Sequence, residues 1–294
     1  MPLRDVLIAL VVVSIWGVNF TVIKLTIAEL PPLLSAALRF FFAAVPVVFF
    51  VPRPKARWLL VAGYGLFMAC ALYALLNLAL FMGLSASLAS LALQVQAMFT
   101  IAIAFFVFGE VPRKLQILGA AVAFGGIGVI AYGHGTGGQL LPFGILILAA
   151  LAWGIANNIS KLAGSIPMLP FTVWGNLIGS IPLLVLAFVF EGGPAIFSYL
   201  DPPSWNTVML VAFLAYPATL FGFTIWAGLL SRHSAATVAP FTLLVPIAGI
   251  SSGVLILGEP IYGVDVAGGV LIFIGLVLTV AKLKPRQAPV LPGA

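Results

Sequence analysis

The sequence predicts an all-α integral membrane protein with ten transmembrane helices, arranged as two inverted repeats of five. Of its 294 residues, 63% are hydrophobic and only 7% are charged, whereas a soluble globular domain carries about 25% charged residues. Apolar runs of bilayer length follow one another along the chain. A similar cluster also opens each half, because Trp16-Gly17 precedes Lys24 with the same spacing that separates Trp153-Gly154 from Lys161.

Proline, glycine and charged residues divide the chain into ten apolar runs. A helix needs ~20 apolar residues to cross the hydrocarbon core. Lipid cannot satisfy exposed backbone polar groups, and the runs are too long and too uniformly apolar for barrel strands. The predicted spans are 6–27, 33–51, 58–82, 85–108, 114–132, 142–163, 169–190, 206–230, 235–257 and 264–282. The first span is too long for the apolar part of a signal peptide and is expected to be retained.

Basic residues occur on alternate connections between these spans. The two termini and the even-numbered connections carry Arg4, Arg53, Lys55, Arg57, Arg113, Lys114, Lys161, Arg232, Lys282, Lys284 and Arg286. The odd-numbered connections carry the acidic residues Glu29, Glu191, Asp201, Glu259 and Asp265. By the positive-inside rule, both termini are expected in the cytoplasm. The net charge of +6 therefore indicates contact with membrane lipid headgroups and not with nucleic acid.

The second half repeats the first. A shift of 137 residues places the first Trp-Gly pair on the second, and a shift of 149 places Gly109-Glu110 on Gly258-Glu259. Chance alignment of apolar sequence is the alternative, but acidic residues are rare in this chain. We therefore expect two five-helix units, residues 1–136 and 137–294. Because five is odd, the second unit must be inverted in the membrane.

These residues resemble the EamA-type family of the drug/metabolite transporter superfamily. The resemblance rests on the two Trp-Gly…Lys clusters, the two Gly-Glu pairs and Ala37-Leu38-Arg39-Phe40 in the second span. It implies a central substrate cavity made by spans 1–4 and 6–9, with spans 5 and 10 behind, and export across the bacterial inner membrane. Within the family, the chain looks most like the aromatic amino-acid exporters. It departs from the family pattern in the second half, where Asn176 stands at the position that matches Arg39 and Pro260 follows the second Gly-Glu pair.

Polar and aromatic residues inside the spans are candidates for the cavity wall, because an unpaired polar group is costly in lipid. Aromatic faces and amides suit an amphiphilic ligand. The candidates are Trp16, Asn19, Arg39, Tyr73, Asn77, Gln94, Trp153, Asn157, Tyr216 and Trp226. The alternative for such residues is hydrogen bonding between neighbouring helices.

Charged residues near or inside the spans have two interpretations. Arg39 could attract a substrate carboxylate, but we favour a structural tie to helix-end carbonyls or to a carboxylate such as Glu110. Lys24 and Lys161 could reach opposite interfaces or form gates, and Glu110 and Glu259 are expected to be structural ties at helix ends. Because no Asp or Glu lies near a helix centre, proton coupling through a buried carboxylate is disfavoured.

Prolines and glycines inside the spans predict sites of bending and close packing. Pro46, Pro182, Pro217, Pro240 and Pro246 interrupt the helical hydrogen bonds and are candidate hinges, with static kinks as the alternative. Gly175 with Gly179, and Gly249 with Gly253, should allow close helix crossings. The glycines of spans 5 and 10, among them Gly119, Gly268 and Gly275, could pack these two helices together or against a second subunit.

Several functions are excluded by missing residues. The single Cys70 and the separated His134 and His233 predict no metal site and no disulfide. The glycine-rich stretch 133–138 has no Lys-Ser/Thr after it, so we expect no ATP and no other cofactor. The sequence thus predicts an alternating-access exporter of amino acids and related small molecules, including aromatic or cationic amphiphiles, as a monomer or homodimer. The alternatives are a multidrug exporter of lipophilic cations, an intramembrane enzyme and a scaffold.

Overall fold

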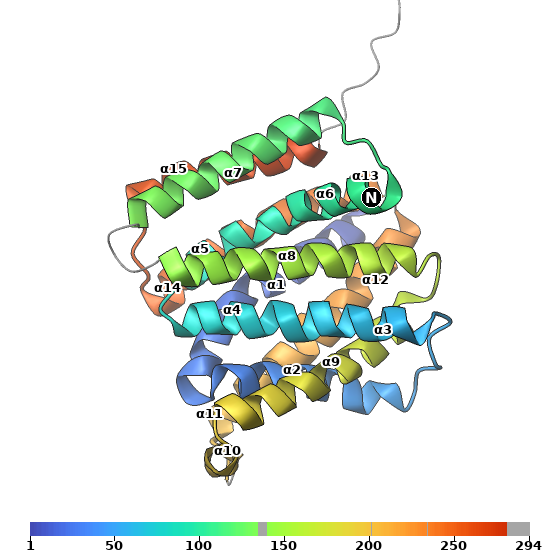
Figure 1. Ribbon diagram of the computed structural model, residues 1–294, viewed down its shortest axis with the longest axis vertical. Helices are drawn as coiled ribbons and strands as arrows, with labels where there is room; N and C mark the ends of the chain where they lie inside the picture. The colour runs from blue at the N-terminus through green and yellow to red at the C-terminus, as the bar shows by residue number, and fades with distance from the viewer. Residues whose placement is uncertain (135–139, 201, 234, 281–294) are drawn as a thin grey trace, which may run out of the picture.

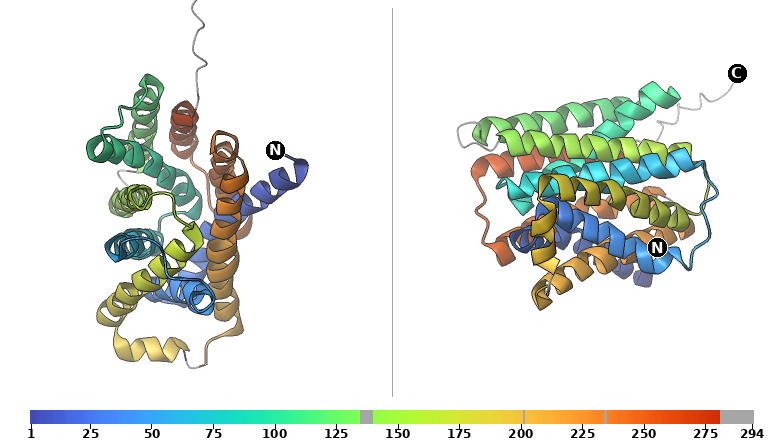
Figure 2. Two further views of the ribbon diagram at one scale, coloured as in Figure 1. Left: turned by 90° about the vertical axis from the view of Figure 1, so that its right-hand side faces the viewer. Right: turned by 60° about the horizontal axis from the view of Figure 1, so that its bottom comes forward.

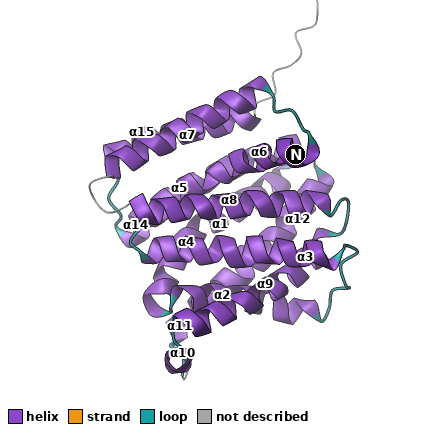
Figure 3. Cartoon of the chain, viewed as in Figure 1, coloured by secondary structure: helices purple, strands orange, loops and turns teal. Residues whose placement is uncertain are grey.

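The computed structural model describes residues 1–134, 140–200, 202–233 and 235–280. These residues form helices joined by loops, and no strand occurs among them (Figure 3). Nine of their helical stretches are long and apolar enough to cross a membrane, and Pro32–Val48 is a shorter apolar helix. The all-helical membrane fold predicted from the sequence is therefore confirmed. Most of the glycine-rich stretch 133–138, with Asp201, Lys282, Lys284 and Arg286, lies outside the described residues.

The long helices lie side by side in one bundle (Figures 1 and 2). The first half contains α1 (Leu3–Glu29), α2 (Pro32–Val48), α3 (Trp58–Tyr64), η1 (Gly65–Ala71), α4 (Leu72–Phe81), α5 (Ala86–Ala92), η2 (Leu93–Val95), α6 (Gln96–Phe108) and α7 (Lys114–His134). The second half contains α8 (Leu140–Leu162), α9 (Met168–Phe190), α10 (Gly193–Leu200), α11 (Trp205–Phe213), η3 (Leu214–Phe221), α12 (Gly222–Arg232), α13 (Ala235–Val238), η4 (Ala239–Leu243), α14 (Leu244–Leu257) and α15 (Gly263–Val280). Consecutive elements with no gap between them, such as α3, η1 and α4, form one span. Grouped in this way, the elements other than α10 correspond to the ten predicted spans.

The short helix α10 was not expected. It lies between the spans predicted at 169–190 and 206–230, and it runs across the direction of the long helices (Figure 2). Its Ile196 is buried against Leu34 of α2 and Ala187 of α9. A few apolar side chains thus suffice to hold a helical turn at the end of the bundle.

Two spans contain a π-helical segment in the same relative position. The segment η1 begins at Gly65 and η3 begins at Leu214, which matches the 149-residue shift found in the sequence. The same shift separates Gly109 and Gly258, which end α6 and α14 with left-handed φ angles of 67° and 65°. The two halves thus share irregular features as well as residues. Single π-helical turns inside α-helices are rare and occur frequently at functional sites.

Glycines bring specific helices into backbone contact. A Cβ atom on Gly65 of η1 would lie 2.1 Å from the carbonyl oxygen of Gly175 in α9, and one on Gly179 would lie 2.3 Å from the carbonyl oxygen of Gly65. The close crossing predicted for Gly175 and Gly179 is confirmed, with η1 as the partner. A Cβ on Gly253 of α14 would likewise lie 2.2 Å from the Ser87 hydroxyl oxygen.

The glycines of α7 and α15 pack these two helices against each other. A Cβ on Gly119 would lie 2.5 Å from the carbonyl oxygen of Gly275, and one on Gly126 would lie 2.5 Å from that of Gly268. The two helices run side by side at one edge of the bundle (Figure 1). Of the two contacts predicted for these glycines, the structure shows the one between α7 and α15.

The candidate hinge prolines occupy different helical settings. Pro46 and Pro182 lie inside α2 and α9, and Pro217 lies inside the π-helical η3. Pro240 is in the 3₁₀ segment η4, and Pro246 is in the first turn of α14. Their role as hinges stays a prediction.

Candidate functional site

A cavity of about 200 Å³ lies among the helices of both halves. Of the residues predicted for the cavity wall, those that line it are Trp16, Asn19, Arg39, Tyr73, Gln94 and Trp153. The wall also contains Phe20, Gln96, Phe223 and Thr242, which the sequence did not single out as cavity residues. The cavity thus combines aromatic rings, amides and one charged side chain in the interior of a membrane protein.

Four predicted cavity residues lie elsewhere. Asn77 is buried and donates a hydrogen bond from Nδ2 to the Pro32 carbonyl, 3.0 Å away, so it ties α4 to the start of α2. Tyr216 lines an outer groove, and Trp226 packs behind Trp16 with ring centroids 5.2 Å apart. Asn157 lines a separate cleft at one end of the bundle. Helical periodicity predicts which residues share a face of a helix, but it does not predict whether that face contacts the cavity, another helix or lipid.

The π-helical segment η3 positions two of the cavity residues. The Ala218 carbonyl accepts a hydrogen bond from the Trp16 indole nitrogen, 3.0 Å away. The Thr219 hydroxyl oxygen accepts one from Arg39 Nε at 2.9 Å and itself donates to the Leu214 carbonyl. The irregular turn around Pro217 thus holds residues from α1 and α2, and we could not have located these contacts from the sequence.

Arg39 is almost fully buried, with 2% of its surface exposed. Its guanidinium carbon lies 4.3 Å from the ring centroid of Tyr73 and 5.4 Å from that of Phe40. No carboxylate among the described residues lies within ion-pair distance of it. The expected tie to Glu110 is therefore wrong, because Glu110 pairs with Lys161 at the end of α6 instead.

One end of the bundle is closed by Glu259. Its carboxylate accepts hydrogen bonds from the backbone nitrogens of Ala86 and Ser87 at 2.7 and 2.9 Å, and from the Ser87 hydroxyl at 2.7 Å. It also pairs with Lys24 at 3.0 Å, and Lys24 donates to the Leu84 carbonyl. Glu259 therefore caps the first turn of α5 and joins it to α1, with 6% of its side chain exposed.

The repeat-related Lys–Glu pair, at the other end of the bundle, is exposed. Lys161 contacts Glu110, but their side chains are 46% and 54% exposed. Beside them is a cleft of about 210 Å³ whose lining includes Thr100, Asn157 and Asn158. The Asn157 amide nitrogen donates to Gln96 Oε1 at 2.9 Å, and Gln96 also lines the central cavity. A hydrogen bond thus links a residue of the end cleft to a residue of the central cavity.

The two Lys–Glu pairs lie at opposite ends of a single span. Glu259 caps the start of the stretch Ala86–Phe108, and Glu110 follows its last residue by two positions. A helical stretch of 23 residues is about 35 Å long at ~1.5 Å per residue. The bundle therefore has a sealed end and an open end, each marked by one lysine from one half and one glutamate from the other.

The Glu259 carboxyl is expected to make stability depend on pH. Burial alone would raise its pKa, but the hydrogen bonds from Ser87, Ala86 and Lys24 outweigh burial and hold the pKa below the ordinary value of 4.5. Such a group stabilises the fold fully above its unfolded-state pKa, and this contribution disappears as pH falls through the lower folded-state pKa. In detergent, the unfolding temperature of the natural protein should exceed that of Glu259→Gln near neutral pH, and the gap should narrow as the pH falls below 4.5. A gap that widens on acidification would contradict this assignment.

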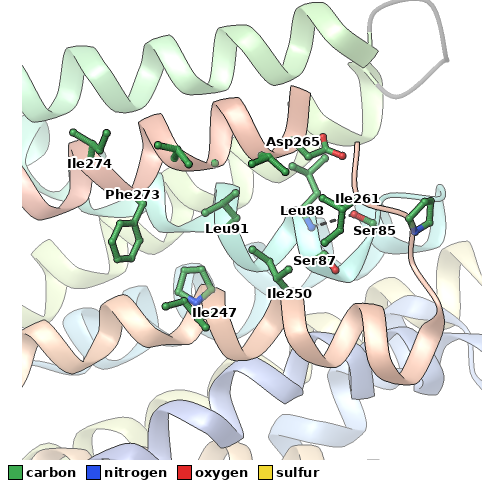
Figure 4. Close-up of a pocket in the computed structure, with 15 residues that line it drawn as sticks. Ser85, Ser87, Leu88, Leu91, Ile247, Ile250, Ile261, Asp265, Phe273 and Ile274 are labelled. Atoms are coloured by element: carbon green, nitrogen blue, oxygen red, sulfur yellow. Dashed lines mark hydrogen bonds between the residues drawn. The ribbon is translucent and has the colours of Figure 1, made fainter. Parts of the chain in front are cut away.

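A second, mainly apolar groove lies outside the central cavity. It has a volume of about 280 Å³ and is formed by α5, α14 and α15 (Figure 4). Leu88, Leu91, Ile250 and Phe273 line it, with Ser85 and Asp265 near one end (Figure 4). It lacks the convergent amides and the buried charge of the central cavity, which is therefore the better candidate for a small polar ligand.

Comparison with known proteins identifies the family. The model of the EamA-like transporter family matches residues 3–132 and again residues 142–281. The chain belongs to the EamA-like transporter family. Two relatives, from Salmonella typhimurium and Escherichia coli K12, are each 38% identical over 98% of both chains, and each is named a probable amino-acid metabolite efflux pump. A Bacillus subtilis relative named uncharacterized transporter YoaV is 27% identical over 94% of this chain and 96% of its own length.

A solved crystal structure has the same fold as this EamA-like chain. It covers 94% of this chain and 95% of its own, with a TM-score of 0.63 and 17% sequence identity. At that identity the likeness shows the fold alone. Together, the family match and the membrane-length helices make this chain a multi-pass membrane transporter of the EamA-like family. The narrower resemblance to aromatic amino-acid exporters stays a prediction.

Proposed function

We propose that this EamA-like protein exports amino acids and related small amphiphilic metabolites from the cytoplasm across the bacterial inner membrane. The names of the two relatives that are 38% identical support amino-acid metabolites as the cargo class. A relative from Escherichia coli named as an inner membrane transporter supports the location. The cargo enters the central cavity from the cytoplasm and leaves on the other side.

The chemistry of the central cavity carries this proposal. Trp16, Tyr73 and Trp153 offer aromatic faces to an apolar side chain, and Asn19 and Gln94 offer amides to polar ends. Among the residues that the structure describes, Arg39 is the only charged one in the cavity lining. A carrier for lipophilic cations would instead gain from a carboxylate facing its cargo. The cavity therefore favours the amino-acid exporter over the multidrug alternative.

Alternating access is the mechanism that the two unequal ends support. The Glu259 end is sealed, whereas the cleft beside Glu110 and Lys161 is open, and the Gln96–Asn157 hydrogen bond links its lining to that of the cavity. The distribution of basic residues supports a cytoplasmic location for the Glu110 end. We infer that the protein is inward-facing here, and that export requires the Glu259 end to open while the other end closes.

The two halves, residues 1–136 and 137–294, are proposed to be the units that move. The family model matches once in each half, and the π-helical segments and left-handed glycines recur at one shift. The repeat-related Lys–Glu pairs cross between the halves at opposite ends of the bundle. Inverted repeats of this kind allow one half to rock against the other around a fixed site.

A transport assay tests the proposed cargo. The purified protein is reconstituted in liposomes, and efflux of a panel of labelled amino acids and one lipophilic cation is compared with efflux from protein-free liposomes. Trp153→Ala should lower amino-acid flux by about tenfold, because a large aromatic contact is lost. The matched control is Trp58→Ala, since Trp58 packs edge-on against Trp174 away from the cavity. If no amino acid moves faster than in the control liposomes, the proposed function is wrong.

The inward-facing arrangement predicts where an engineered thiol can react. Cys70 is buried and is the only cysteine, so Cys70→Ala gives a clean background. Thr100→Cys, which lines the open cleft and is partly exposed, should react with an impermeant maleimide from the cytoplasmic face alone. The control Ala86→Cys, at the sealed end, should resist labelling from both faces because Ala86 is fully buried. Labelling of Ala86→Cys from outside, with Thr100→Cys protected, would show that the opposite end is open.

A further inference from the structure

Arg39 carries a buried positive charge that the protein itself does not neutralise. Its Nε donates to the Thr219 hydroxyl, and its face covers the ring of Tyr73. Its Nη1 atom is buried and has no hydrogen-bond partner. Removing a guanidinium from water without a counter-charge is costly. An unpaired donor of this kind, on a cavity wall, points to an anionic group supplied from outside the chain.

A second unpaired atom belongs to a residue that lines the same cavity. Asn19 is 5% exposed, and its Oδ1 is buried without a hydrogen-bond partner. An amide oxygen is an acceptor, so it suits a group that carries N–H donors. Six buried side-chain atoms of the described residues lack a partner, and two of them, in Arg39 and Asn19, belong to residues of the cavity lining. The cavity lining thus contains an unused cationic donor from α2 and an unused acceptor from α1.

We infer that Arg39 binds the carboxylate of the cargo and Asn19 receives its ammonium group, so that the protein selects zwitterionic α-amino acids. This inference rests on the proposed amino-acid export and adds the recognition chemistry. The aromatic residues Trp16, Trp153 and Phe223 then surround the amino-acid side chain. The planar guanidinium suits a carboxylate, because both of its outer nitrogens can donate in one plane.

The competing interpretation is that Arg39 only ties α2 to η3. In that case its loss would weaken the fold and reduce transport of every cargo by the same factor. The bond to Thr219 uses Nε, however, and leaves Nη1 aimed at no protein acceptor. The two interpretations therefore differ in selectivity, which can be measured apart from stability.

The first experiment needs no variant. Proteoliposomes are assayed with the amino acid that gives the highest flux, and its unlabelled acid, its amide and the amine lacking the carboxyl group are added as competitors. The acid should compete at a concentration about tenfold or more below that of either analogue, because a site built around a buried charge rejects partners that leave it unpaired. Equal competition by all three overturns the inference and leaves amino-acid export intact. Absence of flux for every amino acid overturns the export proposal as well.

Two variants separate recognition from structure. Arg39→Gln should lose the acid preference, so that acid and amide compete within about threefold of each other. Thr219→Val removes the partner of Nε but keeps the guanidinium, and it should retain the preference even where total flux falls. Monodispersity and unfolding temperature in detergent are measured for both. A folded Arg39→Gln protein that keeps the natural preference, or a Thr219→Val protein that loses it, would overturn the assignment.

Discussion

Replacing Glu259 with alanine is expected to lower the unfolding temperature in detergent by about 5 °C or more and to reduce transport at least tenfold. The substitution leaves the backbone nitrogens of Ala86 and Ser87 without their acceptor, and the ammonium group of Lys24 keeps only the Leu84 carbonyl of its two acceptors. Each buried donor without a partner costs ~1–3 kcal/mol. A total of about 3 kcal/mol would reduce the population of the state sealed at this end by roughly 100-fold. A thermal unfolding assay and liposome efflux measure the two effects.

The chain supplies its own control for this prediction. Glu110 occupies the repeat-related position but is half exposed and is paired with Lys161 at the open end. Exposed ion pairs contribute little to stability, so Glu110→Ala should leave the unfolding temperature nearly unchanged. Equal losses of stability in Glu110→Ala and Glu259→Ala would show that the burial of Glu259 does not add to the stability of the fold.

Replacing Gly65 with alanine is expected to prevent normal assembly of the bundle. The added methyl group would lie 2.1 Å from the carbonyl oxygen of Gly175. This oxygen belongs to the backbone of α9, so η1 and α9 must separate along their whole crossing. Overpacking of this kind costs ~1–3 kcal/mol or more, and the yield of monodisperse protein should fall severalfold.

Gly63→Ala is the matched control, two residues earlier along the chain. There the nearest atom to the new methyl group is Cδ1 of Ile159 at 3.4 Å, which is ordinary van der Waals contact with the end of a flexible side chain. Alanine also favours a helix over glycine by ~1 kcal/mol. Size-exclusion profiles in detergent compare the fraction of monodisperse protein in the two variants. If they are alike, the η1–α9 contact does not require a glycine.

The fold could be predicted from the sequence because its signals are local. A bilayer imposes a helix length, and a run such as 142–163 therefore predicts α8 (Leu140–Leu162) to within two residues at either end. The π-helical segments could not be predicted, because they depend on hydrogen bonding inside a span that is apolar throughout. Pro217 marked one irregular segment, but Gly65–Ala71 contains no proline at all.

The site was only partly predictable, because its contacts join residues far apart in the chain. Lys24 and Glu259 were both singled out, yet nothing in the sequence pairs residues separated by 235 positions. The sequence also treated Glu110 and Glu259 alike, whereas the structure buries one and exposes the other. For Arg39 a tie to helix-end carbonyls or to a carboxylate was expected. That it has no carboxylate partner among the described residues became visible only when its neighbours were placed.

The charge content of the cavity lining bears on the direction of flow. A guanidinium stays protonated at any physiological pH, and among the described residues the lining contains no histidine or carboxylate that could pick up a proton on one side and release it on the other. A binding site of this composition gives the carrier no proton exchange of its own. Unless another group couples transport to an ion, flux would follow the concentration difference of the cargo, outward from a cell that has made or absorbed a surplus and inward when the outside is richer.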